Sequence, residues 1–277
     1  MGTSQSSKGP GAGVPMVPPW VPPVPVEEPG ADPSTPDQVP PPAAAPTPIV
    51  APPLAPSARF NGARRNLGSF AHGGGARELR RGLGHYVRSG YGGASTTTRR
   101  FGGTVAGGGA LYDALTALGG TGPAVPGFDP AVLRGQSADQ LMDAVVDASN
   151  PIDGTLDREA SRASTREALS DLLTKHPDAD LTALTEEQKL AAVESYVALD
   201  VFYRLDLDVG QAIRDRSPSV TSAMARLTEV KEYIREAVGN AFRSLRDRGQ
   251  QLTRQGMSRI IAGALREAFT VFESYLK

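Results

Sequence analysis

The chain has 277 residues, a formal net charge of −1 at pH 7 and no cysteine. The lack of cysteine excludes disulfides, thiolate catalysis and cysteine-built zinc or iron–sulfur sites. With only three histidines, a histidine-built metal centre is not expected either, and we predict no metal and no cofactor.

The near-neutral total hides a basic segment between two acidic ones. Residues 1–57 carry one lysine against four acids, and residues 58–104 carry nine arginines against one acid. Residues 105–277 carry 19 basic and 25 acidic side chains. A basic segment of this kind attracts phosphate or folds against the acidic part of its own chain, and the composition leaves both open.

Composition divides the chain into three predicted regions. Residues 1–57 form a disordered Pro/Ala-rich tail, since 18 of the 24 prolines fall between Pro10 and Pro56. Residues 58–122 form a Gly/Arg-rich basic segment with short helices. Residues 123–277 have ordinary apolar periodicity and are long enough to bury one core as a helical domain.

The tail contains the only tryptophan, Trp20, inside a stretch from residue 17 to 26 that reads as polyproline II. One interpretation is a linker tryptophan of no consequence. The sharper one is a docking motif in which Trp20 and its flanking prolines enter a partner's groove. The docking candidates are Pro18, Pro19, Trp20, Pro22 and Pro23.

No membrane span or export signal is expected. The uncharged run from Gly9 to Val26 is about as long as a span, but it contains seven prolines, each of which removes a helix hydrogen bond. No leucine-rich stretch follows basic residues as a signal peptide requires. The sequence therefore predicts a cytoplasmic protein.

The basic segment predicts two helices, over residues 76–88 and 109–118. The glycines, serines and threonines between them suit either close helix packing or disorder. Its arginines alternate with five aromatic residues, a composition that suits single-stranded nucleic acid, an acidic protein surface or helices of the same chain. The nucleic-acid or partner candidates are Arg64, Arg65, Arg77, Arg80, Arg81, Arg88, Arg99 and Arg100.

From Pro123 onward the pattern is helical, so the predicted fold class is all-α. Ser137 to Gln140 and Thr185 to Gln188 have capping-box spacing ahead of apolar runs. Asp153 or Thr155 caps a helix that ends near Lys175.

Ser217 before Pro218 predicts the start of a helix that runs to about residue 246. A last helix starts at Thr253. We expect these two helices to pair antiparallel across a short turn at residues 248–252, as in a bundle.

Catalytic motifs are missing from the sequence. No glycine precedes a lysine, which excludes a Walker A phosphate loop. Asp200, Asp206 and Asp208 are interpreted as solvated charge, and His85 as a surface or packing residue. We expect no catalytic residue and no enzyme activity in this chain alone.

Met1 precedes the small residue Gly2, so removal of Met1 should leave a free glycine amine on the tail. Gly2 is therefore a candidate acceptor for modification by another enzyme. The same residues match a myristoylation pattern, but the composition looks bacterial, where that modification is not expected.

Residues 1–22, which read Met-Gly-Thr-Ser-Gln-Ser and end in Trp-Val-Pro, resemble the start of QatB proteins of the Qat anti-phage defence system. Residues 58–67 and 83–94 and the following Arg99-Arg100 extend the resemblance, whereas the helical C-terminal part is similar only in character. The resemblance implies a bacterial four-component system. Its other members are an ATPase, a QueC-like enzyme of the 7-deazaguanine type and a TatD-like DNase.

The resemblance implies a non-catalytic subunit of an anti-phage complex that assembles with these three partners. A QueC-like enzyme uses ATP to activate a carboxylate and couple it to an amine, and Gly2 is our hypothesis for that amine. The alternative is an adaptor that binds nucleic acid through the basic segment.

Overall fold

The computed structural model describes residues 13–25, 54–246 and 252–276. Within these ranges the regular structure is helical, and pairing between extended residues is limited to two isolated bridges, Pro15 with Leu54 and Val125 with Phe128. The all-α prediction is confirmed. Of the tail expected to be disordered, residues 1–12 and 26–53 lie outside the described residues.

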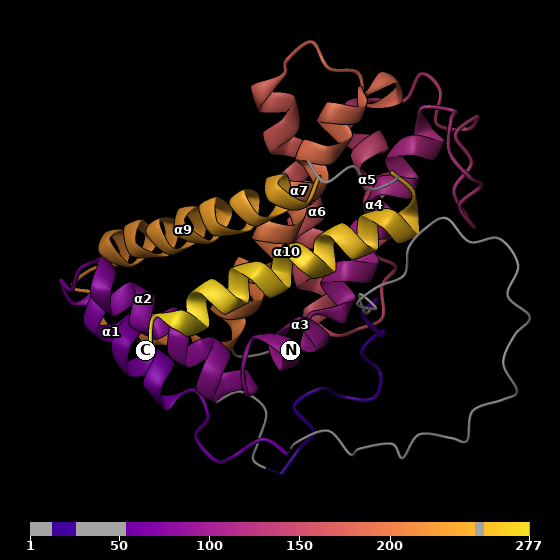
Figure 1. Cartoon of the computed structure of the whole chain (residues 1–277). Coiled ribbons are helices and arrows are strands. Elements are labelled where there is room, and N and C mark those ends of the chain that lie inside the picture. The colour runs from indigo at the N-terminus through magenta and orange to yellow at the C-terminus, as the bar shows by residue number, and fades with distance from the viewer. Residues whose placement is uncertain (1–12, 26–53, 247–251, 277) are drawn as a thin grey trace, which may run out of the picture.

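Ten helices, several of them joined directly end to end, account for the regular structure of the described residues (Figure 1). They are α1 (Asn61–Ala71), α2 (Ala76–His85), α3 (Ala94–Arg100), α4 (Gly102–Leu118), α5 (Ala138–Ser149), α6 (Leu156–Lys175), α7 (Glu186–Leu205), α8 (Gln211–Arg216), α9 (Val220–Arg246) and α10 (Arg254–Ser274). Three short turns complete the order: the π-helical η1 (Tyr86–Gly90) and η3 (Asp206–Gly210), and the 3₁₀ turn η2 (Leu181–Ala183).

One hydrophobic core joins the predicted basic segment to the predicted helical domain. Leu67, Leu83 and Leu111 are buried in the same cluster as Val197 and Ile261. Helix α4 contacts α5, α7 and α10, and α1 packs against α2 and α8. The basic segment thus folds against the rest of its own chain, one of the two outcomes that its charge left open.

Close packing explains the glycines of α4. A Cβ on Gly107 would lie 2.3 Å from the Tyr196 hydroxyl oxygen, and one on Gly108 would lie 2.5 Å from Ile261 Cδ1. Side chains at these positions would push α7 and α10 away. Because its glycines are used for helix contact, α4 starts at Gly102, seven residues before the predicted start at Gly109.

Most of the predicted N-terminal caps are present in the structure. The hydroxyls of Ser137 and Thr185 accept the N–H groups of Gln140 and Gln188, completing both capping boxes. Thr155 caps α6, which ends at Lys175 as expected.

Two predicted boundaries are wrong. Ser219, not Ser217, caps α9: its hydroxyl accepts the Ser222 N–H at 3.1 Å, while the Ser217 hydroxyl donates back to the Ile213 carbonyl. The helix predicted to reach Arg88 ends at His85 and continues as the π-helical turn η1, which lets Tyr86 and Val87 both enter the core.

The two longest helices lie side by side and run antiparallel, as predicted (Figure 1). Residues 247–251, which contain most of the predicted turn between them, lie outside the described residues. Among the described helices, none combines the length and hydropathy needed to cross a bilayer.

The close contacts of the α4 glycines predict that one added methyl group lowers the stability of the fold. Gly107→Ala should destabilise the fold by about 1–3 kcal/mol, because overpacking displaces Tyr196. Gly119→Ala is the matched control, since a Cβ there meets nothing closer than 3.6 Å. Urea unfolding followed by circular dichroism measures both. Equal midpoints for the two variants would show that α4 does not depend on this close approach.

Candidate functional site

Part of the proline-rich tail is held on the helical body. The Gly13 N–H donates to the Ala55 carbonyl at 3.0 Å, and the Ala55 N–H donates to the Val14 carbonyl at 2.8 Å. Met16 is buried, and Val24 packs against the core. Residues 13–25 are therefore anchored at both ends of the described stretch.

The docking candidates form a turn rather than a continuous polyproline II stretch. The Val21 N–H donates to the Pro18 carbonyl at 3.1 Å, which closes a β-turn with Pro19 and Trp20 at its centre. Proline at the second position favours such turns because its φ is already fixed near −65°. The Trp20 side chain is 74% exposed, so the turn presents the indole to solvent.

We call the surface beneath residues 17–25 the tail seat; α3, the start of α4 and α10 form it. A groove of about 350 Å³ remains between the tail and the seat. It is lined by Val17, Val21, Pro22, Pro23, Val24, Pro25, Ser95, Thr98, Arg99, Arg259, Ala262, Gly263 and Arg266. The closest approach is at Gly102, where a Cβ would lie 2.0 Å from the Pro22 carbonyl oxygen.

A network of charged side chains lies next to the seat, and a small pocket lined by Trp20, Val21 and Pro22 reaches it. Arg204 of α7 donates to Asp200 at 2.9 Å and pairs with Asp157 of α6 at 3.1 Å. Arg100 of α3 completes the network by pairing with Asp157 at 2.7 Å.

Hydroxyl groups satisfy the remaining carboxylate oxygens of Asp200, which is fully buried. Ser161 of α6 donates to one oxygen at 2.8 Å, and Thr104 of α4 donates to the other. Four helices therefore meet at one ion-pair network whose donors and acceptors match.

The network shifts the protonation equilibria of Arg204 and Asp157 toward the charged forms. Burial opposes a charge on Arg204, but Asp200 and Asp157 outweigh it and raise the pKa of the guanidinium. Burial likewise opposes a charge on Asp157, but Arg204 and Arg100 outweigh it and lower the pKa of that carboxyl. All these groups stay charged near neutral pH.

The eight candidate arginines divide into two groups. Arg100 is tied into the network, and Arg64 donates to the Asp208 backbone carbonyl at 2.9 Å, so both stabilise the fold. Arg99 is exposed at the tail seat. The remaining five are exposed on α1, α2 and η1: Arg65, Arg77, Arg80, Arg81 and Arg88.

The aromatic residues of the basic segment are not available to stack on bases. Phe60, Phe70, Tyr86, Tyr91 and Phe101 are all buried, each with at most 3% of its surface exposed. Arginine–aromatic alternation arises here because one face of each helix enters the core while the other meets water. The single-strand stacking interpretation of these rings is wrong.

The interpretation of three aspartates as solvated charge is also wrong. Besides Asp200, Asp208 accepts the hydroxyls of Tyr86 at 2.9 Å and Tyr91 at 2.6 Å. Asp206 pairs with Arg214 at 2.6 Å. Burial raises the pKa of Asp208, because desolvation outweighs the two tyrosine hydrogen bonds. The spacing of Asp200 and Arg204, four residues apart, is a sequence signal that could have indicated an ion pair.

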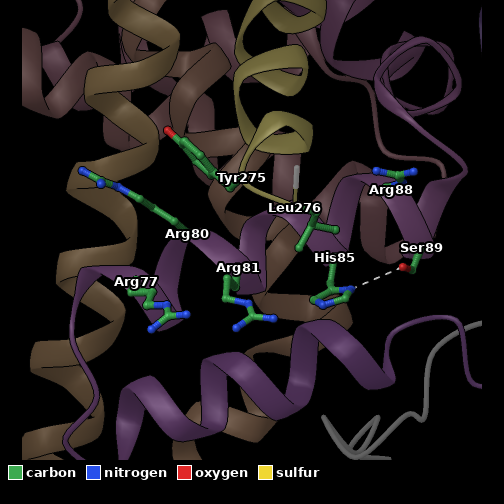
Figure 2. A pocket seen from close by; sticks show the side chains of 8 residues that line it. All are labelled: Arg77, Arg80, Arg81, His85, Arg88, Ser89, Tyr275 and Leu276. Atoms are coloured by element: carbon green, nitrogen blue, oxygen red, sulfur yellow. Dashed lines mark hydrogen bonds between the residues drawn. The ribbon is translucent and has the colours of Figure 1, made fainter.

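A second surface feature is a hollow of about 770 Å³ between α2, η1 and the C-terminal end of α10 (Figure 2). We call it the arginine hollow; its lining residues are Arg77, Arg80, Arg81, His85, Arg88, Ser89, Tyr275 and Leu276. It gathers four of the candidate arginines.

Gly2 lies outside the described residues. Among the described residues, no group of three or more His, Asp or Glu side chains is placed to hold a metal ion. The positions that stand out are therefore the tail seat, the charged network and the arginine hollow.

These features define an all-helical protein with a proline-rich tail segment seated on its bundle. The sequence model of a family described as Qat anti-phage system associated protein QatB matches residues 92–272, more than half of the chain. The chain belongs to the QatB family and is a component of the Qat anti-phage system. The match covers the helices that the sequence had suggested were similar only in character. No curated protein and no solved structure matches the chain.

The close contact at Gly102 predicts that adding one methyl group there releases the tail from the tail seat. In Gly102→Ala the new Cβ would collide with the Pro22 carbonyl, so residues 17–25 should leave the seat. Trp20, the only tryptophan, reports this directly as a fall in its fluorescence anisotropy. Gly119→Ala, at the other end of α4, is the control, because a Cβ there meets nothing closer than 3.6 Å. Unchanged anisotropy in Gly102→Ala would mean that the seat does not hold the tail.

The pKa of Asp157 is lowered and the pKa of Asp208 is raised, so replacing each carboxylate by an amide should change stability differently. Asp157→Asn should cost about 1–3 kcal/mol at pH 7, because Arg100 and Arg204 lose a charged partner. Asp208→Asn should cost nothing, since the amide oxygen still accepts both tyrosine hydroxyls and the buried charge is gone.

Because its pKa is lowered on folding, Asp157 stabilises the fold above its ordinary pKa of about 3.9. This contribution is lost as the pH falls through the lower folded value, so the deficit of Asp157→Asn should shrink in acid. Denaturant midpoints across pH 3–7 measure both variants. A larger loss in Asp208→Asn than in Asp157→Asn would contradict the assignment.

Proposed function

We propose that this chain is a non-catalytic subunit of a Qat defence complex, which assembles with ATPase, QueC-like and TatD-like nuclease partners. Family membership supports a role within the system. The burial of Asp200 and Arg204 in a matched structural network supports a non-catalytic role, since these charges already have partners. The helical bundle serves assembly, and the tail serves recognition.

The observation that carries the proposal is the exposed Trp20 on an anchored turn. A partner that binds a mobile segment must first order it, at a cost in conformational entropy. Here the turn at residues 18–21 is already closed, and Met16 and Val24 fix it on the body. Trp20 then offers a large indole to a partner's groove with little ordering left to do.

Gly2 is the proposed acceptor of a modification by the QueC-like partner. The neutral glycine amine would attack the carbonyl carbon of a carboxylate that the partner has activated with ATP. The bond to the activating AMP or phosphate would break as the amide bond forms, and the nitrogen would lose a proton to water. Gly2 lies eleven positions before Gly13, which is hydrogen-bonded to Ala55. A fully extended chain spans at most about 3.6 Å per residue, so the partner's active site must come within about 40 Å of this anchor.

Intact-mass analysis of the full chain after co-expression with the QueC-like partner tests this proposal. We expect one added mass on the N-terminal peptide. Gly2→Glu should abolish it, because a large second residue retains Met1, while Gly9→Ala should keep it. An unmodified wild-type peptide in the presence of active partner would overturn the proposal.

Protection of cells by the whole operon gives the functional readout. Gly2→Glu and Trp20→Ala should lower protection against a phage panel on which wild type protects, at unchanged protein level on an immunoblot. Gly9→Ala should protect like wild type. Full protection by both variants would show that the tail is dispensable for defence.

The second candidate, a nucleic-acid adaptor, is favoured by the exposed arginines and disfavoured by the buried rings. Because Arg64 and Arg100 support the fold, substitutions at Arg65 and Arg99 test it more cleanly. Salt-sensitive binding of single strands that both substitutions weaken would support this candidate.

A further inference from the structure

The arginine hollow is concave, and its cations lack counter-charges. Among the described residues, no carboxylate forms a salt bridge with Arg77, Arg81 or Arg88. The nearby acids are used elsewhere: Glu78 accepts the Gly75 N–H at 3.0 Å, and Glu273 accepts the Ala94 N–H at 3.0 Å. The three guanidinium groups are therefore left without a direct ionic partner among the described residues.

One arginine of the hollow is held in place while the others extend from the helix. The Nε of Arg80 donates to the Tyr233 hydroxyl at 3.3 Å, and that hydroxyl lies 2.5 Å from the Tyr275 hydroxyl. Its guanidinium also lies about 6 Å from both tyrosine ring centroids. Figure 2 shows Arg77, Arg81 and His85 in a row along α2, with Arg88 and Ser89 on η1 beyond His85.

Neutral groups complete the lining. His85 lies 3.4 Å from the Ser89 hydroxyl, so this pair offers hydrogen bonds at the base of the hollow. The pKa of His85 is lowered, first by burial and then by the charges of Arg81 and Arg65. Leu276 adds an apolar contact from α10.

We propose that the arginine hollow binds the phosphate chain of a compact ligand, such as a nucleoside triphosphate. Guanidinium groups form paired hydrogen bonds with phosphate oxygens, and several arginines around one concavity suit adjacent phosphates. This site lies apart from the tail and does not depend on its proposed modification.

The geometry favours a compact oligophosphate over an extended nucleic acid. The four arginines fall within twelve residues, about 18 Å of helix, and a volume of about 770 Å³ accommodates a nucleotide but not a long strand. The aromatic side chains that would stack successive bases, such as Phe60 and Tyr91, are buried. The rest of the fold, residues 105–277, has an excess of acidic side chains that would repel a polyanion beyond the hollow.

Calorimetric titration of the full chain with inorganic triphosphate, ATP and a single-stranded oligonucleotide tests the proposal. We expect one triphosphate or ATP per chain, and a loss of at least about tenfold in affinity for the double variant Arg81→Gln/Arg88→Gln. The control Arg134→Gln/Lys175→Gln removes the same charge from two exposed positions outside the hollow and the tail seat. It should bind like wild type.

The arms of the experiment separate the possible ligands. Equal affinities for triphosphate and ATP would support recognition of the phosphate chain alone, and tighter binding of ATP would support a nucleotide. Binding of the oligonucleotide without triphosphate or ATP would overturn the proposal in favour of an extended strand. Absence of any binding, or an equal loss in the control variant, would also overturn it.

Discussion

The ion-pair network around Arg204 is the interaction on which the arrangement of the central helices depends. It joins α3, α4, α6 and α7 through two guanidinium groups and two carboxylates, with hydroxyls filling the remaining positions. A buried ion pair of this kind is costly if any member lacks its partner. The helices must therefore meet in one register, and the tail turn that borders the network at Trp20 is placed by the same register.

Close approach at the glycines of α4 is the second constraint, and it explains why the basic segment is not an independent appendage. Gly107 and Gly108 let α7 and α10 approach the central helix. The aromatic rings that accompany the arginines then fill the core between these helices, as Phe101 does against Phe269. The arginines lie on the helix faces opposite these apolar side chains, so they remain at the surface. They leave a basic face on an otherwise acidic fold.

Two surface features follow from this packing, and they suit different tasks. The tail seat fixes a proline-rich segment from which Trp20 projects, a geometry suited to protein partners in a defence complex. The arginine hollow collects unpaired cations beside the end of α10, a geometry suited to a phosphate-bearing ligand. A Qat component that carries both would connect assembly with the sensing of a small anion, although the two sites occupy separate surfaces.

The sequence by itself determined the all-α class, the start of α5 and both ends of α6, because caps and apolar periodicity act over a few residues. It also pointed to the antiparallel pairing of α9 and α10. Only the tertiary structure decided that Arg100 and Asp157, 57 positions apart, form an ion pair and that Asp208 is enclosed by two tyrosines. It likewise decided which glycines lie at close helix–helix contacts and which arginines form no ion pair among the described residues. These outcomes depend on neighbours distant in the chain, whose identity no local pattern specifies.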